Sequence, residues 1–163
     1  MSKASRPPWQ EIPKTIPSKD GARDLSDDMK RRFGINHIYR AWELKCVLDS
    51  DERVVFVGRL AQLNYQDAQG NRSKYGFKGS ASTGLFVVTD SRLILSGPYG
   101  WAPFALASLQ APGPVEHGTF GFSTSSGEHL DVSTAMWLIK PERADQMRQA
   151  LISQLDDTGG EFT

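Results

Sequence analysis

The sequence predicts an α+β fold that is mainly β, in which a small antiparallel barrel or sandwich is closed by a C-terminal helix. Its most informative segment is 82–95, where two apolar, β-branched runs flank the polar pair Asp90-Ser91. This pattern is typical of a tight antiparallel hairpin. The flanking segments also have the composition of strands, and an amphipathic helical pattern follows the last of them. Such a scaffold is more typical of a binding protein than of an enzyme.

Length and composition limit the possible partners. The 163 residues are enough for one domain with a core, and the formal net charge is zero. Without a global positive field, we expect no nucleic acid partner, and an anionic membrane would have to be recognised through a local patch. The only cysteine, Cys46, excludes an intramolecular disulfide, and its apolar neighbours favour a buried structural role. Because no signal-peptide core and no run of about 18 apolar residues is present, we expect a soluble, cytoplasmic protein.

The N-terminal segment 1–25 is polar and contains four prolines among scattered charged residues. Such a composition buries too little apolar surface to offset the entropy of ordering. We therefore interpret 1–25 as a flexible arm. Its two large apolar residues, Trp9 and Ile12, are candidates for docking onto the domain or onto a partner, although an unbound tail is the simpler interpretation.

The next segment, 26–48, has a helical pattern. Ser26 is a suitable N-cap, and two aspartates follow it in the first turn, where the helix dipole favours negative charge. Apolar residues then recur at spacings of three to six, but Gly34 and Asn36 interrupt the pattern. We expect a helix that breaks, resumes and ends near Leu48.

Strand patterns begin after that helix. A first strand is expected over 54–65, with Gly58 as a possible bulge. The segment 66–80 is predicted to be a long polar loop, and the hairpin at 82–95 follows it.

The remaining strands are short. One or two are expected over 101–109, after a turn at 97–100. The alternating segment 117–124 and the segment 130–134 are expected to form a closing hairpin.

The final element is an amphipathic helix. Pro141 suits its first position, and Gly159 and Gly160 end it. Its apolar residues have spacings of three and four and form one stripe that faces the core. These are Ala144, Met147, Leu151 and Leu155.

Several of these segments resemble a known family. The segment 84–95, GLFVVTDSRLIL, combines a strand, a Thr-Asp-x-Arg turn and a second apolar strand. An acidic turn at 48–54 precedes it, a strand-like segment follows at 104–109, and 121–134 has the pattern of a closing hairpin. In these features the chain resembles the bacterial pleckstrin-homology-like (PH-like) and GRAM-type families.

The resemblance covers 48–155 and implies a strongly bent antiparallel barrel of about seven strands, plugged at one end by a C-terminal helix. We accordingly expect a PH-like domain at 49–156 and a flexible tail at 157–163. In the central turn, the Thr89-Asp90 pair is expected to accept hydrogen bonds from turn amides. Arg92 is expected to pair with Asp90 as a structural contact.

We find no sequence motif for catalysis, and we predict no enzyme activity, no cofactor and no metal. Neither a nucleophile elbow, a His-Glu-x-x-His helix, a phosphate-binding loop nor a dinucleotide fingerprint is present. His117 and His129 are able to face each other across the closing hairpin, where with Glu116, Glu128 or Asp131 they would form a weak metal site. A solvated polar face explains these residues better.

Basic residues in the first strand and the following loop suggest an anion site. In PH domains that bind phosphoinositides, basic residues in the comparable region grip phosphates, so the resemblance implies a peripheral membrane or phosphate-binding module as the alternative function. Glycines in the same loop would let backbone amides approach a ligand. The candidate residues, which would make at most a weak contact with anionic lipid, are Arg59, Arg72, Lys74 and Lys78.

Aromatic residues suggest a protein-binding surface, which we take as the main prediction. Tyr99, Trp101 and Phe104 lie in and after a predicted turn, and Tyr75 and Phe77 in the long loop extend the group. The alternative for Trp101 and Phe104 is that they fold into the core. Exposed strand edges also favour strand addition or self-association. We therefore predict a non-catalytic module that binds an unidentified protein partner or forms a homo-oligomer.

Overall fold

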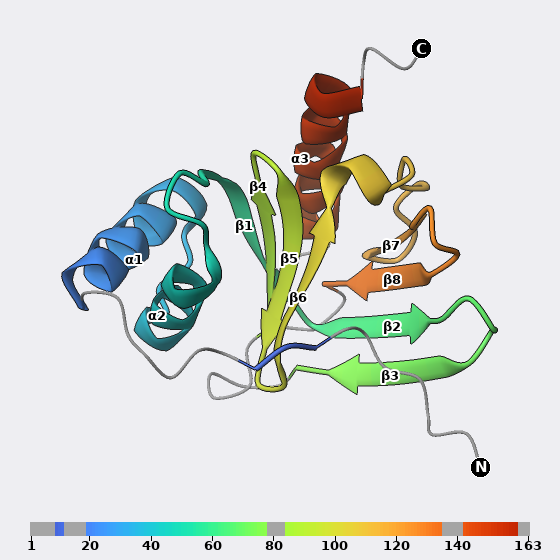
Figure 1. Ribbon diagram of the computed structural model, residues 1–163, viewed down its shortest axis with the longest axis horizontal. Helices are drawn as coiled ribbons and strands as arrows, with labels where there is room; N and C mark the ends of the chain where they lie inside the picture. The colour runs from blue at the N-terminus through green and yellow to red at the C-terminus, as the bar shows by residue number, and fades with distance from the viewer. Residues whose placement is uncertain (1–8, 12–18, 78–83, 135–141, 160–163) are drawn as a thin grey trace.

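The computed structural model describes residues 9–11, 19–77, 84–134 and 142–159. Eight strands form two four-stranded antiparallel sheets, and the helices lie outside them (Figure 1). The first sheet has the strand order β1 (Val54–Leu60), β4 (Gly84–Thr89), β5 (Arg92–Gly97), β6 (Gly100–Ala105). The second has the order β3 (Arg72–Gly76), β2 (Gln62–Gln66), β8 (His129–Ser133), β7 (Thr119–Ser123). The helices are α1 (Lys19–Phe33), α2 (Ile38–Val47), the short 3-10 helix η1 (Leu106–Ser108) and α3 (Glu142–Gly159).

The predicted fold class is confirmed: the chain is mainly β, with N-terminal helices and a C-terminal helix. The hairpin predicted at 82–95 is formed by β4 and β5, with Val87 opposite Ile94 and Val88 opposite Leu93. The closing hairpin is formed by β7 and β8.

The strand predicted over 54–65 runs from one sheet into the other. Only Ala61 separates β1 from β2, and its backbone N–H donates to the carbonyl of Ser133 at 2.8 Å. The predicted bulge at Gly58 is wrong, because the register shift of β1 lies between Val54 and Phe56. A Cβ on Gly58 would lie 2.8 Å from Cγ of Met147, so this glycine makes room for α3.

The prediction of an unbroken loop over 66–80 is also wrong. Arg72–Gly76 forms β3, which pairs with β2 along its full length. Exposed and half-buried residues alternate along it, as expected for an edge strand with one solvated face. The polar sequence of this strand hides that pattern, since only Tyr75 is strongly apolar.

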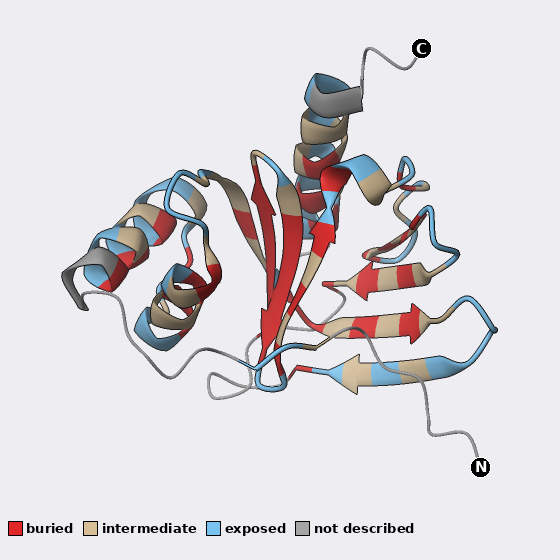
Figure 2. Cartoon of the chain, in the orientation of Figure 1, coloured by how far each residue is buried: buried red, intermediate tan, exposed pale blue. Residues whose placement is uncertain are grey.

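The core has two parts, one on each side of the first sheet. Phe86 and Val88 point between the two sheets, towards α3. Leu85 and Val87 point the other way, towards α1 and α2. Because both of its faces are covered, β4 is buried throughout (Figure 2) and its sequence is a continuous apolar run.

The N-terminal helix begins earlier than predicted. It starts at Lys19, so the boundary placed between 25 and 26 is wrong, and Ser26 is a buried residue inside α1 rather than its N-cap. The predicted break is confirmed: Gly34 ends α1 with φ 71°, and α2 resumes at Ile38 and ends at Val47.

The stripe predicted for the C-terminal helix is confirmed. Ala144, Met147 and Leu151 of α3 are at most 1% exposed and belong to the core between the sheets. Pro141, its predicted first residue, lies outside the described residues. Within the described part of the chain, no helix combines the length and the apolar character that crossing a membrane requires.

Candidate functional site

Aromatic side chains from three distant segments meet at one end of the first sheet. Tyr75 of β3 and Tyr99 of the β5–β6 turn have ring centroids 5.3 Å apart. The ring of Trp9 packs against both, at 5.8 Å from Tyr75 and 6.0 Å from Tyr99. Tyr99 remains 53% exposed, so the cluster reaches the surface.

The segment 9–11 reaches this cluster by pairing with β6 through a single antiparallel bridge. Gln10 lies opposite Trp101, and the two residues exchange backbone N–H···O hydrogen bonds of 2.7 and 3.0 Å. The indole N–H of Trp101 donates to the carbonyl of Glu11 at 3.2 Å. The segment is the short dark blue trace beside β6 in Figure 1.

Gly100 is what allows the close approach. Its φ is 117°, a conformation that L side chains rarely adopt, and a Cβ there would overlap the carbonyl oxygen of Gln10. The free edge of β6 is therefore shaped at this point to receive another backbone. The position of Trp9 in a proline-rich arm was the only sequence signal for this contact.

The predicted protein-binding residues divide into two groups. Tyr75, Tyr99 and Trp101 are exposed or half-buried; the two tyrosines belong to the cluster, whereas the ring of Trp101 packs against the part of the core that faces α1 and α2. Phe77 and Phe104 are only 2% and 5% exposed and belong to the core, so they are unavailable to a partner. The ring of Phe77 lies in a slot between Gly84 and Gly97, where a Cβ would come within 2.8 Å of it.

One polar atom in the cluster has no partner. The indole nitrogen of Trp9 is buried, and no hydrogen-bond acceptor among the described residues reaches it. Leaving a buried donor unpaired is unfavourable. The contact between Trp9 and the two tyrosines is therefore well packed but incomplete in its hydrogen bonding.

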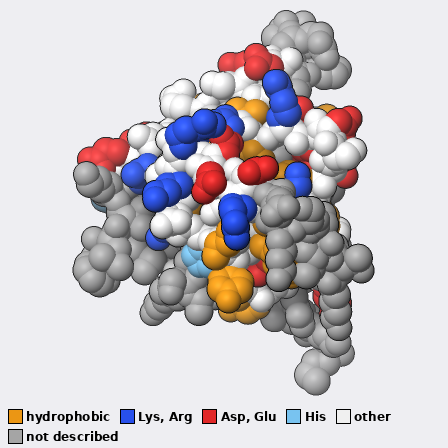
Figure 3. Space-filling view, turned by 90° about the vertical axis from the view of Figure 1, so that its left-hand side faces the viewer, with side chains coloured by type: hydrophobic (Ala, Val, Ile, Leu, Met, Phe, Trp, Pro, Cys, Tyr) orange, Lys and Arg blue, Asp and Glu red, His pale blue; other side chains and the backbone are white. Residues whose placement is uncertain are grey.

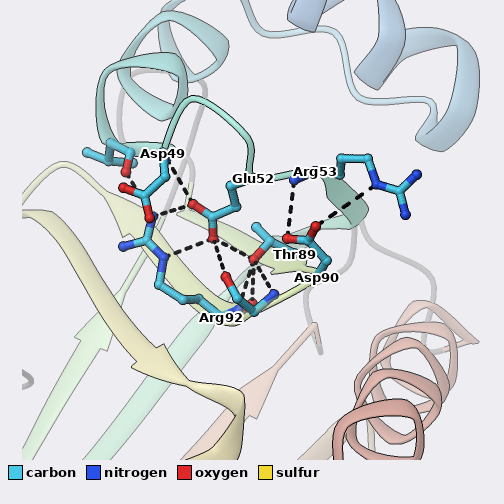
Figure 4. Close-up of polar contacts among 8 residues, drawn as sticks. Asp49, Glu52, Arg53, Thr89, Asp90 and Arg92 are labelled. Atoms are coloured by element: carbon cyan, nitrogen blue, oxygen red, sulfur yellow. Dashed lines mark hydrogen bonds and ion pairs between the residues drawn. The ribbon is translucent and has the colours of Figure 1, made fainter.

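A buried ion pair supports the first sheet beside this edge (Figure 4). The carboxylate of Glu52 accepts from Nε of Arg92 at 2.9 Å and from Nη2 at 2.5 Å, and also from the hydroxyl of Thr89 at 2.6 Å. Arg92 also donates to the carbonyl of Val47 at the end of α2, and its guanidinium lies 5.5 Å from the ring of Trp101. Arg92 thus links the acidic turn, the helix and the β6 edge.

The expectation that Arg92 pairs with Asp90 is wrong. Asp90 turns to the other side, where Oδ1 accepts from the backbone N–H of Arg53 at 3.3 Å (Figure 4). The predicted capping of the turn is confirmed for Thr89, whose hydroxyl oxygen accepts from the backbone N–H groups of Ser91 and Arg92.

Burial alone would raise the pKa of the Glu52 carboxyl. Hydrogen bonds from Arg92, Thr89 and the Asp49 backbone, together with the charge of Arg92, outweigh it and lower the pKa from 4.5 to about 2. The ionised carboxylate is consequently the form that stabilises the fold.

We expect E52Q to reveal this carboxylate through the pH dependence of stability. The protein should be more stable than E52Q by a constant amount above about pH 5, and the difference should shrink as the pH falls from 4.5 towards 2, because the unfolded chain then takes up a proton that the folded chain resists. Urea unfolding of both proteins between pH 3 and 7 measures this difference in stability. A difference that does not change with pH would contradict the assignment.

The candidate anion-binding residues are not brought together. Arg72 and Lys74 are exposed on the outer face of β3, in the second sheet, whereas Arg59 is exposed on β1 in the first. Lys78 lies outside the described residues. The alternative function therefore stays a prediction for which the geometry adds no support.

The two histidines considered for a metal site lie at opposite ends of the closing hairpin. His117 precedes the Thr119–Ser133 pair, whereas His129 is paired with Ser123 at the other end. His129 contacts Asp131 through Nε2 at 3.2 Å and Ser123 through Nδ1 at 2.9 Å. The idea that the histidines face each other is wrong, and within the described residues no three His, Cys, Asp or Glu side chains are grouped to hold a metal ion.

A cavity of about 560 Å³ lies where α1 and α2 meet the start of β1. Its lining carries both signs of charge, and Arg32 is already engaged by Asp28 at 3.0 Å and by the carbonyl of Val54 at 3.1 Å. Basic and acidic side chains are also mixed over this face of the molecule (Figure 3). Because these charges compensate one another, we assign the cavity no ligand.

No family model matches the chain, and no curated protein matches it. Among solved structures, the chain is similar to the crystal structure of the N-terminally truncated linker-DH/PH domains of p115-RhoGEF, with 10% sequence identity and a TM-score of 0.46. The match covers 85% of this chain and 39% of that one, so it spans about two fifths of the length of that chain.

Proposed function

We propose that this protein is a non-catalytic protein-binding module that takes up an extended segment of its partner along the free edge of β6. An aromatic side chain of that segment packs against both Tyr75 and Tyr99. The observation that carries the proposal is that residues 9–11 of the same chain already occupy this surface in that way.

The chemistry of the edge supports this function. An edge strand presents unpaired backbone N–H and C=O groups, and an added strand gains affinity from them while side-chain pockets supply specificity. Trp101 offers a backbone donor, a backbone acceptor and its indole N–H within one residue. The two tyrosines add rigid aromatic surface, which is typical of the residues that dominate binding energy.

Selection of binding peptides from a random library tests the proposal with the purified full chain. We expect selected peptides to contain an aromatic residue, and Tyr75→Ala and Tyr99→Ala each to weaken them at least tenfold, or about 1.4 kcal/mol. Fluorescence anisotropy with labelled peptides measures the affinities. Peptides whose affinity survives both substitutions would contradict the proposal.

Arg72→Ala/Lys74→Ala is the matched control. Both residues lie on β3, the strand of Tyr75, but their side chains are on the exposed face. Peptide affinity should not change in this variant. If instead the variant loses binding to anionic vesicles at low salt while Tyr99→Ala keeps it, the alternative function in lipid or phosphate binding would be favoured.

A further inference from the structure

We infer that Trp9, Gln10 and Glu11 are a tethered ligand that competes with the partner for the β6 edge, and that the partner supplies an extended segment whose aromatic residue directly precedes the residue that pairs with Trp101. The inference rests on the proposed function. It names the chemistry of the partner segment and adds a regulatory contact.

The tethered segment makes a small contact. It forms two backbone hydrogen bonds with Trp101 and one with the indole of that residue, and it inserts a single ring. Contacts of this size bind weakly between separate molecules, but attachment to the same chain raises the effective concentration to the millimolar range. The segment can therefore occupy the site in the absence of a partner and still be displaced by a longer strand.

The buried indole of Trp9 also supports the inference that a partner can displace this segment. Its ring packs against both tyrosines, but no acceptor in the described part of the chain reaches its N–H. A phenyl ring at this position would carry no donor to leave unpaired. A partner segment with phenylalanine there should bind at least as tightly as one with tryptophan.

The order of residues in the segment gives the register of the ligand. Trp9 occupies the aromatic cluster and the next residue, Gln10, pairs antiparallel with Trp101. Gly100 clears the path for the backbone of that second residue. The side chain of Gln10 is exposed, so the ligand is expected to tolerate any polar residue at this position.

A labelled peptide with the sequence of residues 5–14, SRPPWQEIPK, tests the competition when it is titrated with full-length variants. Trp9→Ala should bind this peptide at least tenfold more tightly than the unchanged protein, because its own segment no longer fills the cluster. Gln10→Pro is a second release variant, since proline cannot donate the 2.7 Å hydrogen bond to Trp101. Circular dichroism and thermal unfolding check that both variants are folded.

Two controls define the site. Adding Tyr99→Ala to Trp9→Ala should remove the gain, and a peptide with alanine in place of tryptophan should lose at least tenfold in affinity. A peptide with phenylalanine there should match the original, and a tenfold loss would overturn the inference from the unpaired indole.

The outcomes separate this inference from the proposed function. If library peptides bind in a Tyr99-dependent manner but Trp9→Ala does not strengthen them or the 5–14 peptide, the module stands and the tethered ligand is refuted. If the affinity of no peptide depends on Tyr75 or Tyr99, the proposed function and the tethered ligand are both refuted. A dimer that forms with rising concentration and is abolished by Trp9→Ala would show that the segment acts between two copies, which would overturn its action within one chain.

Discussion

Replacing Arg92 with alanine is expected to destabilise the fold by about 3 kcal/mol or more. The side chain of Glu52 is 1% exposed and Arg92 is its only ion-pair partner among the described residues. Removing the guanidinium leaves a carboxylate that is buried without an opposite charge, which costs more than the pair itself contributes. Urea unfolding at neutral pH, with circular dichroism as the signal, measures the change.

Arg53→Ala is the control for this prediction. Arg53 lies near the same turn, but its side chain is 84% exposed and its Nε is 4.0 Å from Asp90. An exposed pair of this kind contributes roughly 0–1 kcal/mol. Equal losses for the two variants would mean that the position of the turn, and not the buried ion pair, stabilises this corner.

The double variant Glu52→Gln/Arg92→Ala distinguishes the stability contributed by the ion pair from the contributions of its two residues taken singly. If the buried charge causes the loss, removing it as well should recover part of the stability, so the effects of the single substitutions will not add.

Arg92 also lies over the ring of Trp101, which receives the N-terminal segment. The same variants therefore test whether the stability of this corner and the occupancy of the β6 edge are linked.

The parts of the fold that the sequence predicts are those with strong local patterns. The β4–β5 hairpin and the stripe of α3 depend on apolar periodicity that is visible within a short window. β3 was missed because its residues are mostly polar and it exists only through pairing with β2. Lys19 as the start of α1 was missed because proline and charge dominate the composition around it.

The site was only partly predictable for a different reason. Tyr75, Tyr99 and Trp9 come together through contacts between distant segments, which no local pattern records. The partner of Arg92 is 40 residues away, whereas the neighbouring Asp90 was the natural choice from sequence. Phe77 and Phe104 show the converse case, in which an aromatic residue near a turn is drawn into the core.

The second large effect is expected at Phe86, which holds the two sheets together. This residue of β4 is completely buried, and its ring packs edge-to-face on Phe120 of β7, with centroids 6.0 Å apart. Because β4 belongs to the first sheet and β7 to the second, the contact spans the core between them. Aromatic pairs of this geometry add to the stabilisation that burial alone provides.

Phe86→Ala is therefore expected to lower the free energy of unfolding by about 4 kcal/mol, since it removes a buried ring and leaves a cavity that a sheet cannot close. For a domain of ordinary stability this is about a quarter or more of the total. Tyr39→Ala is the control, because the Tyr39 side chain on α2 is 73% exposed and its loss should change stability by less than about 0.5 kcal/mol. Urea unfolding of the unchanged protein and the two variants measures both losses. Each loss follows from the shift of the unfolding midpoint when the slope of free energy against urea concentration is the same. A loss below about 1.5 kcal/mol for Phe86→Ala would mean that the two sheets are held together mainly by α3 and the strands that pass between them.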